Sequence, residues 1–315
     1  MTWYALRAAH ESVAATRHLL AGASPATWAR LSVLVLFAGG LTTPFLVDFN
    51  YGSELLDGTV GVDPSSTAVL AAGGGFVGLA ALLAGAIAEF VLLDALRGDP
   101  VRLVARGRRW FHAGVQLFVF RLVVLCLLAL VGLTGIRADD PGPAVLLALA
   151  LVAGTIVVLD RVTVAFVVPI VFVDGRSLPA GWRAFLPTLR AQWHQYVGYL
   201  LVAGTLGFAI AILGGLLAAL VAIAFAVPFS AFGAVVAAAL IEQGLSAPTV
   251  GRVVVLALAA PYLAVVLGSV LLVHVAPVAY LRYVSLFVLG DTTGRYDPIP
   301  QVRAAVRRGG SALGD

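Results

Sequence analysis

The sequence predicts an all-α, polytopic integral membrane protein: a bundle of about six transmembrane helices with amphipathic helices along the cytoplasmic interface. Three observations lead to this prediction. Of the 315 residues, 61% are hydrophobic and only 11% are charged, whereas soluble domains carry about 25% charged residues. The apolar residues gather in six long stretches, and the arginines cluster at one set of their ends. A water-soluble core could not bury this much apolar surface, but a bilayer can.

Each apolar stretch is long enough to cross ~30 Å of hydrocarbon, which takes about 20 residues. The expected spans are residues 29–47, 67–96, 114–136, 144–173, 196–224 and 253–289. We therefore predict one integral membrane domain, 1–315. It comprises an N-terminal interfacial helix (1–28), six transmembrane spans (29–289) and a cytoplasmic tail (290–315). The first span is expected to remain as a signal anchor.

The arginines also predict the orientation. Sixteen of the 20 arginines fall on the side that holds both termini, and an excess of Lys and Arg marks the cytoplasmic side of a membrane protein. Only Arg137 and Arg252 fall on the opposite side. The first loop there, residues 48–66, carries four carboxylates and no basic residue. The prediction is a multi-pass protein of the cell membrane with cytoplasmic N- and C-termini.

Residues 196–243 complicate the span count, because at ~1.5 Å per residue this stretch could cross a bilayer twice. A seventh span would move the arginines of the tail to the outside, against the distribution elsewhere. We therefore expect one span over 196–224, a break at Pro228 and an interfacial helix over 229–243. A half-spanning or fully spanning arrangement of 229–243 stays open.

Three cytoplasmic segments combine an apolar stripe at helical spacing with arginines on the opposite face. They precede the odd-numbered spans and contain Trp28, Trp110 and Trp182 near the membrane entry. Such helices lie in the interface, with arginines toward anionic headgroups. Membrane lipids, through anionic headgroups at the cytoplasmic face, are therefore the expected partners. Nucleic acid is not expected, since topology and the anionic leaflet explain the sequence pI of about 9.6.

Glycines in the second span predict close helix packing. Gly74 and Gly78 form a GxxxG pair, and Gly85 continues the same small face, which lets another helix approach closely. The run is not a phosphate loop, because it lacks the following Lys with Ser or Thr. Whether the packing partner belongs to the same chain, to a second copy or to another protein stays open.

Ionisable residues inside the spans are the candidate site, because each is costly there and is kept only with a partner or a purpose. They are Glu89, Arg121, Asp160, Arg161 and His274. Counted from the cytoplasmic ends, they share one layer in the inner half of the membrane. The expected pairs are Glu89 with Arg161 and Asp160 with Arg121. This layer either fixes helix order or lines a polar cavity, and His274 is expected to be a packing residue.

The sequence contains no motif that indicates catalysis or metal binding. The chain has no HExxH, no serine elbow and no paired-carboxylate motif, so we predict no enzyme activity, no catalytic residue and no cofactor. Cys126 is the only cysteine and gives no metal-binding spacing. The four external carboxylates lack the alternating spacing of a calcium loop, so no metal site is expected.

Two stretches carry a resemblance to a known family: residues 160–189, DRVTVAFVVPIVFVDGRSLPAGWRAFLPTL, and residues 275–307, VAPVAYLRYVSLFVLGDTTGRYDPIPQVRAAVR. With the opening TWYALRAAHESVAATRHLL, they resemble six-span haloarchaeal membrane proteins that carry a domain-of-unknown-function label. The resemblance implies a haloarchaeal cell membrane and no assigned activity. The plan of interfacial helix and hairpin is distantly similar to membrane domains of some glycerophosphodiester phosphodiesterases, but no phosphodiesterase residue is present.

Two functions follow as hypotheses. The favoured one is a non-enzymatic membrane protein that organises lipid or binds partner proteins through its interfacial helices and arginine-rich cytoplasmic face. The alternative is a small-solute transporter or permease that uses the intramembrane layer as its site and nearby prolines as hinges. A water-accessible cavity around the layer would favour transport, and a dry, closed network would favour the organising role.

Overall fold

The computed structural model describes residues 4–38, 64–98, 102–137 and 142–311, and every regular element in these ranges is helical. The helices are α1 (Tyr4–Ala21), α2 (Pro25–Ala38), α4 (Pro64–Leu96), α5 (Leu103–Arg137), α6 (Pro143–Val162), the π-helix η3 (Thr163–Val167), α7 (Val168–Asp174), α8 (Leu178–Ala191), α9 (Trp193–Glu242), α10 (Ala247–Thr292), the 3₁₀ turn η4 (Gly294–Tyr296) and α11 (Pro300–Ser311).

Among the described residues, five helical segments are long and apolar enough to cross a membrane. These are Gly75–Leu96, Leu103–Gly135, Pro143–Asp174, Trp193–Glu242 and Ala247–Thr292. They cover the expected second to sixth spans. The expected first span begins within the shorter apolar helix α2, while its residues 39–47 and most of the acidic loop after it lie outside the described ranges.

Two expected helix breaks are absent. Helix α9 continues through Pro228 over 50 residues, so the separate helix expected over 229–243 is wrong. A proline removes one backbone hydrogen bond, but a neighbouring helix can support such a position. Here the Tyr262 ring of α10 packs on Phe229, with centroids 5.5 Å apart, and its hydroxyl donates to the Ala222 carbonyl at 3.0 Å. Helix α5 likewise runs without a break from Leu103, so the second interfacial segment is part of a long helix.

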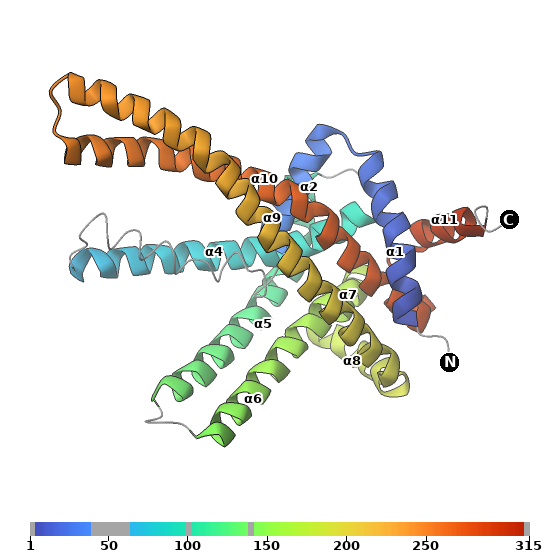
Figure 1. The fold of residues 1–315 in the computed structure, drawn as a ribbon. Coiled ribbons are helices and arrows are strands. Elements are labelled where there is room, and N and C mark those ends of the chain that lie inside the picture. The colour runs from blue at the N-terminus through green and yellow to red at the C-terminus, as the bar shows by residue number, and fades with distance from the viewer. Residues whose placement is uncertain (1–3, 39–63, 99–101, 138–141, 312–315) are drawn as a thin grey trace.

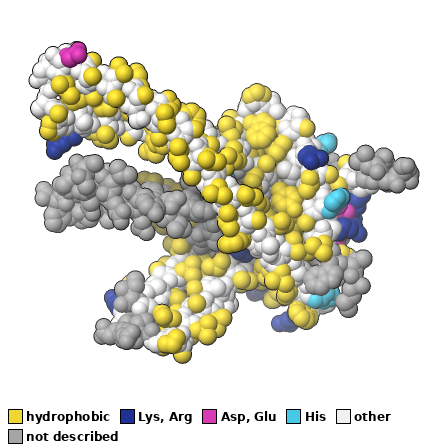
Figure 2. Space-filling view, in the orientation of Figure 1, with side chains coloured by type: hydrophobic (Ala, Val, Ile, Leu, Met, Phe, Trp, Pro, Cys, Tyr) yellow, Lys and Arg dark blue, Asp and Glu magenta, His cyan; other side chains and the backbone are white. Residues whose placement is uncertain are grey.

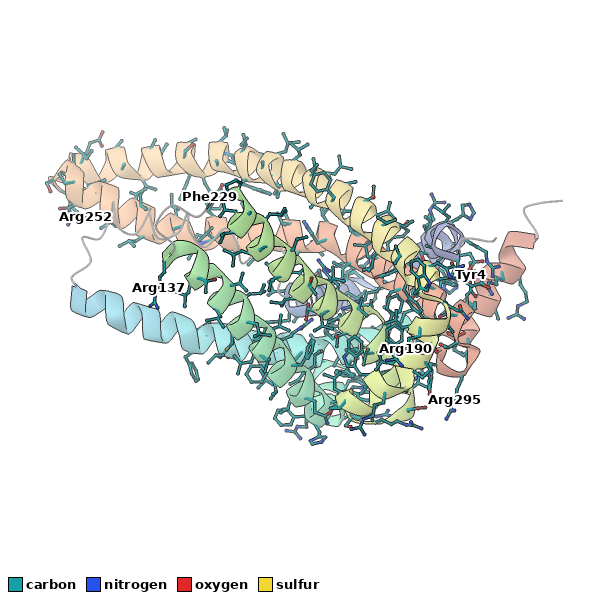
Figure 3. All side chains as sticks on the ribbon, turned by 90° about the horizontal axis from the view of Figure 1, so that it is seen from below. Tyr4, Arg137, Arg190, Phe229, Arg252 and Arg295 are labelled. Carbon is teal, nitrogen blue, oxygen red and sulfur yellow. The ribbon has the colours of Figure 1, made fainter. Side chains whose placement is uncertain are left out.

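The helices diverge as three arms from one packed body (Figure 1). The arms are the α9–α10 hairpin, the first part of α4, and the α5–α6 hairpin. The body comprises α1, α2, α7, α8 and α11 with the adjoining ends of the long helices. Both ends of the chain lie at the body. Tyr4, Arg190 and Arg295 also lie there, whereas Arg137 and Arg252 lie toward the arm ends (Figure 3).

The surface chemistry differs between arms and body. Hydrophobic side chains cover much of the visible arm surface, while most of the visible histidines and basic groups lie at the body (Figure 2). Large apolar residues of the arms are strongly exposed, including Leu151, Phe208 and Leu256 at 63%, 70% and 73%. Apolar surface of this extent fits hydrocarbon better than water.

Aromatic rings form much of the core of the body. Phe166 of η3 packs against Phe185 of α8 and against Tyr196 and Tyr199 of α9, with ring centroids between 4.7 and 5.6 Å apart. Trp110 stacks between Phe90 and Phe172, which places it inside the body. Helix α1 crosses α10 (Figures 1 and 3) through small buried residues: Ala5, Ala8, Ser12 and Ala15.

Candidate functional site: a buried charge cluster

Four charged side chains from four helices meet inside the bundle, and we call them the charge cluster: Glu89 of α4, Arg121 of α5, Asp160 of α6 and Arg282 of α10. Arg121 donates through Nη2 to Glu89 Oε1 at 2.8 Å. Arg282 binds the other Glu89 oxygen through its own Nη2. The Arg121 Nε lies 3.7 Å from Asp160 Oδ1. The side chains of Glu89 and Arg121 are each 1% exposed.

The π-helix explains why Arg282 belongs to this cluster. The Val168 N–H bonds to the Thr163 carbonyl, five residues back, so it is not available to the Val164 carbonyl four residues back. The next residue, Pro169, has no N–H to donate. The Val164 carbonyl would therefore be an unpaired acceptor, which is costly when buried. Arg282 Nη1 donates to it at 3.0 Å.

The cluster is balanced in charge but not fully bonded. Two carboxylates face two guanidinium groups, so the ionised cluster is neutral. Within the described residues, Arg121 Nε and Asp160 Oδ1 are buried without a hydrogen-bond partner. They face each other at an ion-pair distance, too long for a direct hydrogen bond. The Glu89 side of the cluster is tightly bonded, and the Asp160 side is looser.

The structure brings together three of the five intramembrane residues identified in the sequence. Asp160 and Arg121 face each other, as in one of the two expected pairs. The pairing of Glu89 with Arg161 is wrong, because Glu89 binds Arg121 and Arg282 instead. Adjacent helical residues point about 100° apart, and with Asp160 directed inward, Arg161 is exposed.

His274 takes its described contacts outside the cluster. Its Nδ1 lies 2.8 Å from the Val270 carbonyl one turn earlier in α10. A Cβ at Gly214 of α9 would come within 3.1 Å of its Nε2, so the imidazole fills the space above this glycine. The contact helps α9 and α10 to lie close together.

Arg282 was missed by sequence reasoning, which counted it among the cytoplasmic arginines. It lies ten residues before the end of α10 and its side chain is 14% exposed. Its position in the sequence could have identified it as an intramembrane residue, because it follows an unbroken apolar run and lies at a depth similar to that of Glu89. The proline at 169 offered a second clue, since it leaves a carbonyl on the neighbouring helix without a donor.

The three glycines of the second span differ in their surroundings. A Cβ at Gly85 would lie 2.5 Å from the Phe37 backbone oxygen, so α2 approaches α4 closely there. Gly78 has no described neighbour within 4 Å of such a Cβ. The surroundings of Gly74 lie outside the described side chains.

A second ionic group, which we call the terminal cluster, joins α1, the end of α10 and α11. Arg307 donates to Glu11 of α1 at 3.1 Å and to Asp291 of α10 at 2.8 Å. Arg303 donates to Asp291 at 2.9 Å and to the carbonyls of Leu286 and Phe287. These bonds tie both ends of the chain to one helix.

Burial and pairing act on these two arginines in opposite directions. Burial lowers the pKa of the Arg303 guanidinium, and Asp297 and Asp291 oppose it only in part. Burial also lowers the pKa of Arg307, but its hydrogen bonds to Glu11 and Asp291 outweigh burial and leave that pKa raised. Guanidinium groups keep their charge in proteins, so both arginines act as fixed cationic bridges.

The chemistry of the charge cluster is that of ion pairing. In the described part of the chain, no group of three or more His, Cys, Asp or Glu side chains could hold a metal ion. Cys126 is a free, exposed thiol on α5. The cluster pairs its charges with one another where four helices meet.

These features define a class: the five long apolar helices in the described ranges, with charges buried between them and apolar side chains facing outward, are consistent with a multi-pass membrane protein. The chain belongs to a family of unknown function, DUF7544, which matches residues 3–299. No curated protein and no solved structure matches it.

Proposed function

We propose that this chain is a non-enzymatic protein of the cell membrane that organises lipid or binds partner proteins, with both termini on the cytoplasmic side. The observation that supports this most is the closure of the charge cluster. Glu89, Arg121 and Asp160 are at most 3% exposed, and neither of the two cavities described in the molecule is lined by any of them. A transport or catalytic site needs access for its substrate, whereas a structural network does not.

The outer surface supports the same proposal. The arms expose apolar side chains along lengths that match or exceed a bilayer, and the body carries the arginines expected at a cytoplasmic interface. On this proposal the arms contact lipid chains and the body contacts anionic headgroups or a cytoplasmic partner. The charge cluster keeps the helices in register between these two surfaces.

Transport of a small solute is the second candidate, and one observation favours it. The π-helix lies directly after Asp160, π-bulges occur often at functional sites, and the Arg121–Asp160 contact is not fully hydrogen-bonded. A carboxylate in such a place is the type of group that exchanges protons or cations in transporters.

A flux measurement separates the two candidates. The purified chain, Asp160→Asn and the control Asp174→Asn would be reconstituted in liposomes and tested for proton-coupled and cation-coupled uptake. We expect no flux above protein-free liposomes in any of them, and only a modest loss of melting temperature in Asp160→Asn. A reproducible flux that disappears in Asp160→Asn, with an unchanged melting temperature, would establish the transporter instead.

A further inference from the structure

A cavity of about 1000 Å³ lies in the body, and none of the four charge-cluster residues lines it. Its walls come from α1, the start of α2, the ends of α4 and α10, and α11. This volume is at the upper end of the range for small-molecule sites, about 300–1,000 Å³. The terminal cluster crosses it, because Glu11 on one wall binds Arg307 on the other. This bond fixes the positions of the two walls relative to each other.

The lining is apolar for most of its area. Leu31, Leu96 and Tyr283 contribute core side chains that are at most 1% exposed. The Tyr283 hydroxyl donates to the Leu96 carbonyl at 2.9 Å, so its ring presents only an apolar face. Val302 and Val306 of α11 complete this region. Such a lining favours a hydrocarbon chain over a hydrated ion.

The polar part of the lining is cationic. Arg97 and Arg307 contribute two positive charges and Glu11 one negative charge, which leaves one net positive charge with the histidines neutral. His10 and His18 are exposed on the cavity face of α1. Arg97 is held in place by a 2.7 Å bond from its Nε to the Pro298 carbonyl. An anionic group is the complement of this rim.

We propose that this cavity binds an anionic phospholipid, with its headgroup at the Arg97 and histidine rim and part of an acyl chain against the half-buried side chains of Leu19, Val302 and Val306. The inference deepens the proposed lipid-binding function and rests on it. Lipid is favoured over a soluble anion because the apolar lining would otherwise stay in contact with water. The cavity also adjoins α2, which is apolar and packs against the α4 arm, so a chain can reach it along a membrane-facing helix.

The test uses two tryptophans on neighbouring positions of α11. Ala305 lines the cavity, whereas Ala304 is exposed and does not, so Ala305→Trp fills the site and Ala304→Trp is the matched control. Native mass spectrometry and thermal shift in detergent would measure binding of phosphatidylglycerol, of phosphatidylcholine with the same chains, and of inorganic phosphate. Melting temperatures without lipid show whether both variants are folded.

We expect phosphatidylglycerol to bind the unmodified chain and Ala304→Trp equally. Its binding to Ala305→Trp should be at least about tenfold weaker. The unmodified chain should also bind phosphatidylglycerol more tightly than phosphatidylcholine. Equal binding to all three proteins would overturn the assignment to this cavity while leaving lipid binding as such in place. Equal binding of phosphate, lost in Ala305→Trp, would show a soluble-anion site. No lipid retained by the unmodified chain would contradict both the cavity and the proposed function.

Discussion

A single guanidinium, that of Arg282, connects three helices. It binds Glu89 of α4 and the Val164 carbonyl of η3 from its own position on α10. Removing it leaves that carbonyl without a described donor and leaves Glu89 with Arg121 as its remaining partner. Loss of one member of a buried ion pair costs about 3–5 kcal/mol, because an uncompensated charge stays behind.

Arg282→Leu should therefore lower the free energy of unfolding in detergent by an amount of this order, while Arg161→Leu, at the exposed position next to Asp160, should lower it less. Adding Glu89→Leu to Arg282→Leu should cost less than the sum of the two single changes, because the two residues are partners. Strictly additive losses, or an equal loss from Arg161→Leu, would show that the contact contributes no stability.

Substitutions at Gly85 and Gly78 provide a second prediction at the residue scale, because they should affect the melting temperature differently. A methyl group at Gly85 would collide with the Phe37 backbone, whereas at Gly78 it would meet no described atom. Alanine is about 1 kcal/mol more favourable than glycine inside a helix. Gly85→Ala should thus lower the melting temperature, and Gly78→Ala should leave it unchanged or raise it. If both variants shift in the same direction, the close approach of α2 to α4 is refuted.

Sequence reasoning reached part of the cluster at this scale. The cost of burying charge identified Glu89, Arg121 and Asp160 as residues that need partners. It paired Glu89 with Arg161 and missed Arg282, because the correct partner depends on helix rotation and on the extra residue in the π-turn. A prediction from helical periodicity assumes 3.6 residues per turn, so it does not detect a π-turn.

At the scale of the element, the break expected at Pro228 is absent, and the prolines that begin helices are ones that follow a loop. Pro64, Pro143 and Pro300 each begin a helix, as expected for a residue without an N–H in the first turn. Pro228, Pro261 and Pro277 lie inside helices. A local sequence pattern does not distinguish the two outcomes, because a proline can be accommodated inside a helix that packs against neighbouring helices.

Helix α11 is held to the body chiefly through one buried arginine. Arg303 binds Asp291 and two backbone carbonyls of α10, and its guanidinium lies 5.5 Å from the Phe287 ring centroid. Hydrogen bonds that involve a charged group contribute about 1.5–3 kcal/mol each. The short helix has few other polar bonds to α10 among the described residues.

Arg303→Gln should therefore release α11. Amide hydrogen exchange across residues 300–311 should rise by at least about tenfold, since each 1.4 kcal/mol of lost stability is a factor of ten. Arg308→Gln, at an exposed position of the same helix, should leave exchange unchanged. Protection that persists in Arg303→Gln would mean that the bonds of Arg307 and apolar contacts are enough to hold the helix.

At the scale of the whole molecule, the bond between Glu11 and Arg307 bears on how many times the chain crosses the membrane. It places α1 and α11 at the same end of the bundle, and two ends that touch in this way lie on one side of a membrane. The five described candidate spans are an odd number, so an arrangement with both ends on one side would need one more crossing. We expect that crossing between α1 and α4, where α2 supplies its first 14 residues.

Cysteine labelling tests this expectation on a Cys126→Ser background. Single cysteines at Gly142 and Ser246, in the connections at the arm ends, should react with an impermeant reagent from outside intact cells. Single cysteines at His10, Ser177 and Gly309, at the body, should react only after the membrane is opened. Reaction of His10 and Gly309 from opposite sides would exclude an even number of crossings.

The length of α9 carries one more consequence. At ~1.5 Å per residue, its 50 residues extend about 75 Å, and no charged residue lies between His194 and Glu242. A hydrocarbon layer is only ~30 Å thick, so this helix and its partner α10 exceed it more than twofold. Hydrophobic mismatch of this size forces steep tilt or local thickening of the bilayer. We therefore expect the stability of the α9–α10 arm to depend on the thickness of the surrounding bilayer.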